Sequence, residues 1–300
     1  MRGCASYPTP EGGAVEAPEI DPVEFRDGQR TQWNQAAQGW RKWSDVIDDA
    51  LSGVSDRLVE LAGIGPGTRV LDVAAGYGEP SLTAARAAGA EGGVVASDIS
   101  AEMLAFGRER AAAAGVGTIE FVEAGAMDLD FPAASFDAAV SRFGIIFEPD
   151  GEGAAARVRE FLRPGSRFAI ASWGLPEQVP FLAIPMKTAM ERLEVPPPPP
   201  GTPGPLSRPT PDALSALLEG GGFTEVEVKE MEVTFTLDSA EQFAELLQET
   251  VPPLVAMIAP RPPDVQAQTW DAITDAFQAH ASDDGSVTLS NLVLLAAGRA

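Results

Sequence analysis

Residues 70–80 read Val70-Leu71-Asp72-Val73-Ala74-Ala75-Gly76-Tyr77-Gly78-Glu79-Pro80, and this stretch decides the fold. It begins as a short apolar strand and ends in a proline that suits the first turn of a helix. Glycine has no Cβ, so the backbone at Gly76 and Gly78 can approach a ligand closely. The helix N-terminus beyond them favours a negative group such as a carboxylate. The stretch therefore predicts a strand, a ligand-binding turn and a helix.

A carboxylate ends the next predicted strand. Gly93–Ser97 is short and apolar, and Asp98 follows it, 20 residues after Gly78. Ser100 can cap a helix that begins near Ala101. A carboxylate in this place can accept hydrogen bonds from both hydroxyls of a ribose. A glycine pair alone is common in tight turns, but with Asp98 it predicts a nucleoside-binding crevice at the carboxyl ends of parallel strands.

Strands and helices alternate through this part of the chain. The first strand is expected at Arg69–Val73, and later ones at Thr118–Val122, Phe136–Ser141 and Arg167–Ser172. The helices between them are expected at Pro80–Ala88, from Ala101 onward, and at Glu152–Leu162. Strands separated by helices imply parallel crossovers, so the predicted fold is α/β with a doubly wound sheet.

The chain divides into four predicted segments. Residues 1–24 are rich in Gly, Pro, Ala and Glu and predict a disordered tail. Residues 25–62 carry apolar side chains at spacings of three and four, which predicts helices, with a break expected at Gly53. Residues 63–175 hold the alternation of strands and helices. Residues 176–300 hold the remaining elements.

The regular alternation lapses after Trp173. The run Pro196–Pro200 must be extended and predicts a loop. The elements expected beyond it are a helix at Pro211–Glu219, a strand at Phe223–Leu237, helices at Ser239–Glu249 and Val265–Ala281, and a final strand at Val287–Ala296.

Composition narrows the class of partner. The formal net charge of −23 over 300 residues argues against binding to nucleic acid or to anionic membranes, which needs basic patches. Cys4 is the only cysteine, so no internal disulfide or cysteine-based zinc site is possible, and no metal cluster is expected. No apolar run approaches the length of a membrane span, and no signal peptide is expected at the start. We therefore expect a cytoplasmic protein that acts on a small molecule.

Four segments resemble the class I S-adenosylmethionine-dependent methyltransferases, above all the branch similar to the ubiquinone and menaquinone C-methyltransferases. They are Val70–Leu82, Val94–Met103, Phe131–Pro149 and Arg157–Trp173. The resemblance implies a seven-stranded, mostly parallel, Rossmann-like sheet whose one antiparallel strand would be Val287–Ala296. It implies S-adenosylmethionine as cofactor, a helical lid over residues 25–62, and substrate-cap helices with the Pro-rich loop within residues 176–300.

The resemblance also assigns cofactor contacts residue by residue. Asp72 would serve the methionine end of the cofactor and Asp98 the ribose. Ser141 and the residues after it would form the floor below the methyl group. The other cofactor contacts are small loop residues and residues near the adenine, namely Ala74, Gly76, Gly78, Ile99, Met103, Gly125, Ala126 and Met127.

The sequence departs from the family pattern at two of these positions. The family commonly has an aspartate after the third strand that accepts the adenine amino group, whereas this chain has Gly125. Asp128, three residues on, can substitute if the loop bends suitably. Ala74 replaces the first glycine of the commoner loop pattern, which is a mild change because alanine is small.

Candidates for the methyl transfer itself are few. The cofactor carries the reactive group, so the protein mainly aligns the reactants and excludes water. Glu148 is a candidate for proton handling and Arg142 for orienting an anionic acceptor, while His280 is the only histidine. Each also has a purely structural interpretation: Glu148 would lie in a solvated loop, Arg142 would form an ion pair, and His280 would lie at the end of a helix. Plant-type phenolic methyltransferases have a histidine just after the fifth strand, where this chain has Trp173.

The acceptor is expected to be a small, partly apolar molecule that is methylated on oxygen or carbon. Its pocket is expected to be lined by aromatic residues, although an aromatic stripe at helical spacing is also typical of a core. The candidates are Trp40, Trp43, Phe143 and Trp173.

Two other functions stay open. A dinucleotide-dependent oxidoreductase would need G-x-G-x-x-G, but Ser81 stands at the third glycine position. A non-catalytic binding or assembly protein with a methyltransferase fold would explain Gly125 and the scarcity of bases.

Overall fold

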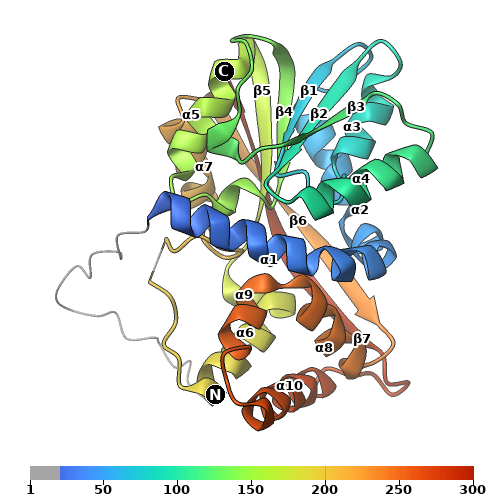
Figure 1. The fold of residues 1–300 in the computed structure, drawn as a ribbon, viewed down its shortest axis with the longest axis vertical. Coiled ribbons are helices and arrows are strands. Elements are labelled where there is room, and N and C mark those ends of the chain that lie inside the picture. The colour runs from blue at the N-terminus through green and yellow to red at the C-terminus, as the bar shows by residue number, and fades with distance from the viewer. Residues whose placement is uncertain (1–20, 200) are drawn as a thin grey trace, which may run out of the picture.

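The computed structural model describes residues 21–199 and 201–300, which form one mixed sheet flanked by helices (Figure 1). The strand order is β3-β2-β1-β4-β5-β7-β6. The strands β1 to β5 run parallel to one another, and β7 runs antiparallel to both β5 and β6. The predicted seven-stranded sheet with one antiparallel strand at its C-terminal end is therefore confirmed. The strands are β1 Arg69–Val73, β2 Gly93–Asp98, β3 Ile119–Glu123, β4 Phe136–Arg142, β5 Leu162–Trp173, β6 Thr224–Leu237 and β7 Val287–Arg299.

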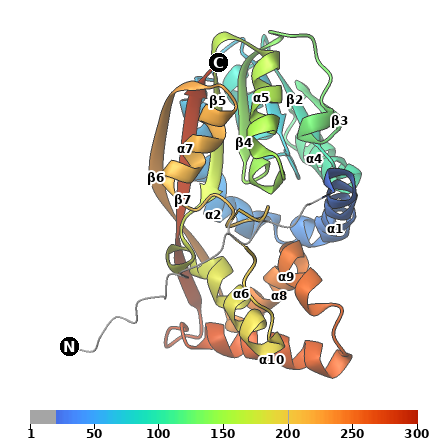
Figure 2. The ribbon, with the colours of Figure 1, turned by 90° about the vertical axis from the view of Figure 1, so that its left-hand side faces the viewer.

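Helices cover both faces of the sheet (Figure 2). Val70 packs in the core that includes the helices α2 and α3, whereas its neighbour Leu71 packs in the core that includes α5 and α7. Successive side chains of a strand point to opposite faces, so a strand covered on both sides reads as a continuous apolar run. The helices are α1 Pro22–Lys42, α2 Ser44–Leu61, α3 Ser81–Ala88, α4 Ala101–Ala113, α5 Gly151–Phe161, α6 Pro180–Leu193, α7 Pro211–Gly220, α8 Ala240–Thr250, α9 Pro252–Ile258 and α10 Pro263–Gln278.

A helical cap lies beyond the carboxyl ends of the parallel strands and consists of α6, α8, α9 and α10 (Figures 1 and 2). Its interior is aromatic. Phe181 of α6 stacks on Phe235 of β6 with ring centroids 4.2 Å apart, and Phe243 of α8 stacks on Phe277 of α10 at 5.1 Å. The helix α1 crosses between the sheet and this cap (Figure 1). Of the helices in the described ranges, none is both long enough and apolar enough to cross a bilayer.

The first helix begins earlier than expected. Residues 1–20 of the predicted tail lie outside the described residues. The helix α1 begins at Pro22, inside the segment expected as tail, because Asp21 caps it: its Oδ1 accepts a hydrogen bond from the amide of Val23 at 2.9 Å. The predicted cap at Ser100 is present, since its Oγ accepts from the amide of Met103 at 3.1 Å.

The expected helix break at Gly53 was wrong. The helix α2 runs through Gly53, and the two helices part at Trp43 instead. A Cβ on Gly53 would lie 2.7 Å from Cε of Met231, so this glycine allows α2 to pack closely on β6. Gly53 thus allows a close contact between a helix and a strand. The sequence around it does not indicate that contact.

Two helices were not anticipated, and the strand β5 begins earlier than expected. Prolines at the start and inside of α6, and at the start of α9, made these segments look irregular. Both are held by tertiary packing of residues such as Phe181 and Leu254, which are buried in the core. The strand β5 begins at Leu162 and not at Arg167, because Leu162 already pairs with Phe136 of β4.

Candidate functional site

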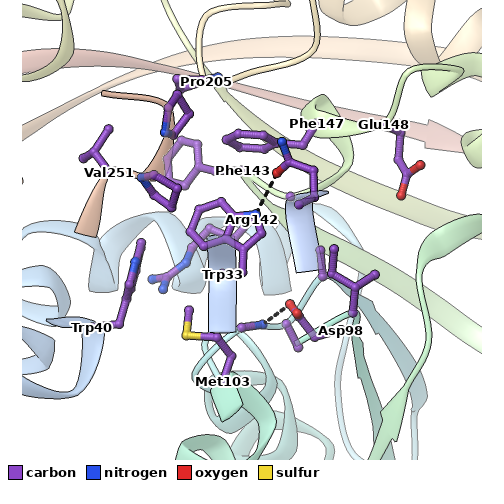
Figure 3. Close-up of a pocket in the computed structure, with 18 of the residues that line it drawn as sticks. Trp33, Trp40, Asp98, Met103, Arg142, Phe143, Phe147, Glu148, Pro205 and Val251 are labelled. Carbon is purple, nitrogen blue, oxygen red and sulfur yellow. Dashed lines mark hydrogen bonds between the residues drawn. The ribbon is translucent and has the colours of Figure 1, made fainter. Parts of the chain in front are cut away.

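A cavity of about 410 Å³ opens at the carboxyl ends of the parallel strands, where α1 and the cap face the sheet (Figure 3). One part is lined by the loop after β1, the end of β2 and the loop after β3. The other part is lined largely by aromatic and aliphatic side chains of α1, the sheet and the cap. We call this second part the apolar wall; it consists of Trp33, Trp40, Phe143, Trp173, Phe181, Phe235 and Leu246.

The glycine loop and Asp98 come together as predicted. Gly76 has a φ of +54°, and its amide donates to Oδ2 of Asp98 at 2.8 Å (Figure 3). The amide of Ser100 donates to Oδ1 of Asp98, also at 2.8 Å. Burial raises the pKa of Asp98 to about 6, against the opposing effect of these backbone donors. Each carboxylate oxygen keeps a second acceptor position, so the group can still bind hydroxyls of a ligand in the cavity.

Gly78 does not line the cavity but packs against the helix α4. Its φ is +99°, and a Cβ there would lie 3.3 Å from Cα of Gly107 in α4. This glycine therefore lets the loop and α4 approach each other. Ala74 lines the cavity with a positive φ of 57°, a conformation that costs energy for a residue other than glycine.

Asp72 lies beneath the loop and outside the cavity wall. It is fully buried, and its Oδ2 accepts from Oγ of Ser81 at 2.5 Å. Its Oδ1 is buried and has no hydrogen-bond partner within the described part of the chain. Burial raises the pKa of Asp72 to about 7. A buried carboxylate oxygen without a hydrogen-bond partner lowers the stability of the ligand-free protein.

Asp72→Asn is expected to stabilise the ligand-free protein at alkaline pH. Because folding raises the pKa of Asp72 from 3.8 to about 7, the native state binds its proton more tightly than the unfolded state does. The free energy of unfolding therefore falls as pH rises from about 4 through 7, by at most about 4 kcal/mol for a change of this size. Asparagine cannot ionise, so urea unfolding at pH 8 should show a more stable variant, with a smaller difference at pH 5. Equal destabilisation at both pH values would contradict this account.

Gly125 and Asp128, the two residues considered for the adenine end, do not line the cavity, although they lie next to each other. A Cβ on Gly125 would lie 3.3 Å from Oδ2 of Asp128, so the Asp128 carboxylate lies close to where an aspartate at 125 would project. Asp128 is bound by Arg26 of α1, whose Nη1 lies 2.6 and 2.7 Å from its two oxygens. Arg26 itself lines the cavity and joins the loop after β3 to α1.

Glu148 lies on the same side of the cavity (Figure 3). It is largely buried, and burial raises the pKa of its carboxyl, while a hydrogen bond from the backbone of Ala126 opposes that shift. Met127, expected near the adenine, borders the cavity but is 47 % exposed. Ile99, Met103 and Ala126, also expected near the adenine, line the cavity.

Of the aromatic candidates, three line the cavity and one does not. Phe143 stacks on Trp173 with ring centroids 4.4 Å apart and planes 9° from parallel. Nε1 of Trp40 donates to the carbonyl of Thr250 at 3.0 Å, which fixes the ring at the cavity wall. Trp43 was wrongly expected there: α1 ends at Lys42, so Trp43 leaves the helical stripe and donates to Glu249 at 2.6 Å.

Two further expectations need correction. Ser141 is fully buried outside the cavity wall, where its Oγ accepts from the amide of Ile145 at 3.0 Å and shapes the turn after β4. His280 follows α10, is exposed and does not line the cavity, so the only histidine is not placed to handle a proton there. Arg142 and Glu148 both line the cavity.

Residues that the sequence interpretation missed complete the site. Glu79, directly after Gly78, lines the cavity with a side chain only 10 % exposed, and its Oε2 accepts from Oγ1 of Thr83 at 2.8 Å. Tyr77 also lines the cavity. The position of Tyr77 between the two glycines of the loop could have indicated its place in the site. No feature of the sequence around Arg26 indicates that it lines the cavity. No group of three or more histidine, cysteine, aspartate or glutamate side chains within residues 21–199 and 201–300 is arranged to hold a metal ion.

Comparisons with known proteins agree with this geometry. Residues 70–165 match a family model described as a methyltransferase domain. The chain is 36 % identical over 139 residues to the ubiquinone/menaquinone biosynthesis C-methyltransferase UbiE of Teredinibacter turnerae, covering 44 % of this chain and 56 % of that protein. It is 39 % identical over 128 residues to an uncharacterized protein of Mycobacterium tuberculosis (strain ATCC 25618 / H37Rv), covering 43 % and 45 %. The matches thus span about half the length of these relatives.

Solved structures share the fold. The YcgJ protein from Bacillus subtilis superposes with a TM-score of 0.54 at 17 % identity, covering 82 % of this chain and 98 % of that one. A putative methyltransferase from Bacillus halodurans C-125 gives a TM-score of 0.54 at 19 % identity, covering 82 % and 97 %.

Proposed function

We propose that this chain, whose residues 70–165 form a class I S-adenosylmethionine-dependent methyltransferase domain related to the ubiquinone/menaquinone C-methyltransferases, methylates a small, partly apolar acceptor on oxygen or carbon. The observation that carries the proposal is Asp98, which ends β2 at the cavity with both oxygens aligned by the amides of Gly76 and Ser100. Such a carboxylate fits the two hydroxyls of a ribose, in the crevice where a doubly wound sheet binds its ligand.

The remaining surroundings of Asp98 fit the same cofactor. Ile99, Met103 and Ala126 offer apolar surface for the adenine, and Glu148 and Arg26 offer polar groups beside it. The loop from Ala74 to Gly76 lines the cavity where the methionine end would lie, with the buried Asp72 outside the cavity wall. Bound S-adenosylmethionine supplies a methyl group on a positively charged sulfur.

The acceptor would lie against the apolar wall. In-line transfer requires alignment and the exclusion of water more than it requires a base. The aromatic side chains of this wall, with the Phe143–Trp173 stack among them, suit an apolar body. The helix α1 closes the cavity between the sheet and the cap. We propose that it acts as a lid that must move away for the ligands to enter and leave.

Calorimetry tests the proposal directly. The full chain should bind S-adenosylhomocysteine, the demethylated product of the cofactor, and should not bind NAD. Binding of NAD instead would favour an oxidoreductase, although Ser81 stands where that class needs glycine. Absence of any nucleoside binding would remove the enzyme interpretation. Cofactor binding without methylation of any acceptor in a broad panel would favour a non-catalytic assembly role.

Affinity for S-adenosylhomocysteine is expected to fall as pH drops through about 6. The ribose hydroxyls donate to Asp98, so binding needs its carboxylate form, and burial raises the pKa of this group to about 6. Below that pH each unit should cost up to about ten-fold in affinity. Titrations between pH 5 and 8 measure the effect, and Asp98→Asn should bind more weakly with a flatter profile. A wild-type affinity that stays constant from pH 5 to pH 8 would contradict the assignment of Asp98 to the ribose.

A further inference from the structure

Arg142 lies at the cavity wall as a buried cation with neutral partners. It ends β4 and is only 8 % exposed. Its Nη1 donates to Oγ of Ser55 at 3.0 Å, and its Nη2 donates to the hydroxyl of Tyr77 at 2.9 Å. Burial raises the pKa of Tyr77, so its hydroxyl stays protonated, and that proton points to Asp48 at 2.7 Å. Both partners of the guanidinium are therefore uncharged.

Three acids act on Arg142 from a distance without an ion pair, and one of them is the buried Asp72, which accepts from Ser81. Asp48 of α2 accepts from Tyr77 and forms an ion pair with Arg110. Glu79 accepts from Thr83, and both acids act on Arg142 only as more distant charges. Within the part of the chain that the structure describes, no carboxylate lies within 4.0 Å of the Arg142 guanidinium. A buried cation without a close anion is costly, so this arrangement favours an anionic ligand.

The surroundings of Arg142 are apolar. Ile47 and Leu51 precede Ser55 by two turns and one turn of α2, so they lie on the same helix face, and both line the cavity. The ring of Trp40 lies 5.2 Å from that of Tyr77, which holds Arg142. A positive charge that has no ion-pair partner and is set beside aromatic and aliphatic side chains favours an apolar molecule that carries one anionic group.

We propose that Arg142, held in place by Tyr77 and Ser55, binds an anionic oxygen of the methyl acceptor, either a carboxylate or an ionised phenol or enol on an apolar body. The guanidinium uses two of its five N–H groups in the bonds described, which leaves donors for such an oxygen. An acceptor that binds as its anion has already lost its proton to solvent. No histidine base is then required at the apolar wall.

The inference rests on the proposed function only in placing the acceptor in this cavity. The first test uses the full chain saturated with S-adenosylhomocysteine and compares 2-naphthoate with the neutral 2-naphthamide by calorimetry. The naphthoate is expected to bind at least about ten-fold more tightly. A second arm uses 4-nitrophenol, whose ionised form absorbs visible light, and the bound phenol is expected to ionise at lower pH than the free one. The two arms separate a carboxylate site from a phenolate site.

Three variants assign the effect to Arg142. Arg142→Met should lose the preference for naphthoate while naphthamide binding stays unchanged, and Arg142→Lys should retain part of the preference. The matched control is Arg167→Met, which removes a half-buried arginine of the neighbouring strand β5 that pairs with Glu227 outside the cavity. It should bind both probes as the wild type does.

Several results would overturn the inference. They are equal binding of naphthoate and naphthamide by the wild type, no binding of either anion, and equal loss of both probes in Arg142→Met. The comparison within the wild type decides the matter even if that variant fails to fold. Failure of the proposed function would look different, because the wild type would then not bind S-adenosylhomocysteine at all.

Discussion

Asp98→Ala is expected to weaken the binding of S-adenosylhomocysteine about a hundred-fold or more, which corresponds to about 2.7 kcal/mol. The substitution removes a charged acceptor for the ribose hydroxyls, and hydrogen bonds to charged groups are among the strongest in proteins. It also leaves the amides of Gly76 and Ser100 without their partner, so the loop loses the constraint that shapes it. Calorimetry at pH 7.5, above the raised pKa of about 6, measures the full effect.

Glu123→Ala is the matched control for this substitution. Glu123 pairs with Asp98 in register on the adjacent strand β3, and it is an acid too, but it is exposed and outside the cavity wall. The control should bind as the wild type does. An Asp98→Ala protein that binds within about three-fold of the wild type would show that the ribose is held elsewhere.

Gly39→Ala is expected to displace the helix α1. A Cβ at Gly39 would lie 2.2 Å from the carbonyl oxygen of Glu249 in α8, where ordinary contacts are 3.4 Å or more. The helices must then separate by more than an ångström, which disturbs the hydrogen bonds of Trp40 to Thr250 and of Trp43 to Glu249. We expect the free energy of unfolding to fall by about 1–3 kcal/mol. We also expect hydrogen exchange in α1 and the dissociation rate of S-adenosylhomocysteine to rise about ten-fold or more.

Gly28→Ala is the matched control, since it makes the same change in the same helix. A Cβ on Gly28 meets nothing within 4 Å. Alanine favours a helix over glycine by about 1 kcal/mol, so exchange in α1 should stay equal or become slower. If the two variants exchange and release the ligand at the same rate, α1 is not the lid.

The core of the fold was predictable because its signals are local. The strand β1 has the predicted bounds, Arg69–Val73, since burial on both faces gives an uninterrupted apolar run next to turn-forming glycines. The link from Gly76 to Asp98 follows from the order of strands and loops, which places both at one edge of the sheet. The helices α6 and α9 were missed because their prolines outweighed a weak apolar pattern, while tertiary packing decides their structure.

The rest of the candidate site depends on contacts between distant segments. Arg26 meets Asp128 across 102 residues of sequence, and Arg142 meets Ser55 across 87. No periodicity or spacing reports such pairs. At Trp43 the local pattern was present but misleading. Trp43 continues the helical spacing in the sequence, but the helix α1 ends one residue earlier, and the ring donates to Glu249 and does not line the cavity. Local pattern thus located the cofactor side of the cavity better than the acceptor side.

The long strands β6 and β7 join the cap to the sheet. The later part of β7, Val293–Arg299, pairs with β5 in the sheet. The earlier part of β7 and the later half of β6 pair with each other and pack in the core that includes the cap helices. Phe235 and Val287 in those halves pack with the cap helices, so cap and sheet share two continuous strands. The cap is therefore no exchangeable module, because its removal would also shorten two of the seven strands. Single side-chain replacements in the apolar wall, in contrast, leave this shared frame and the loop at Gly76 in place.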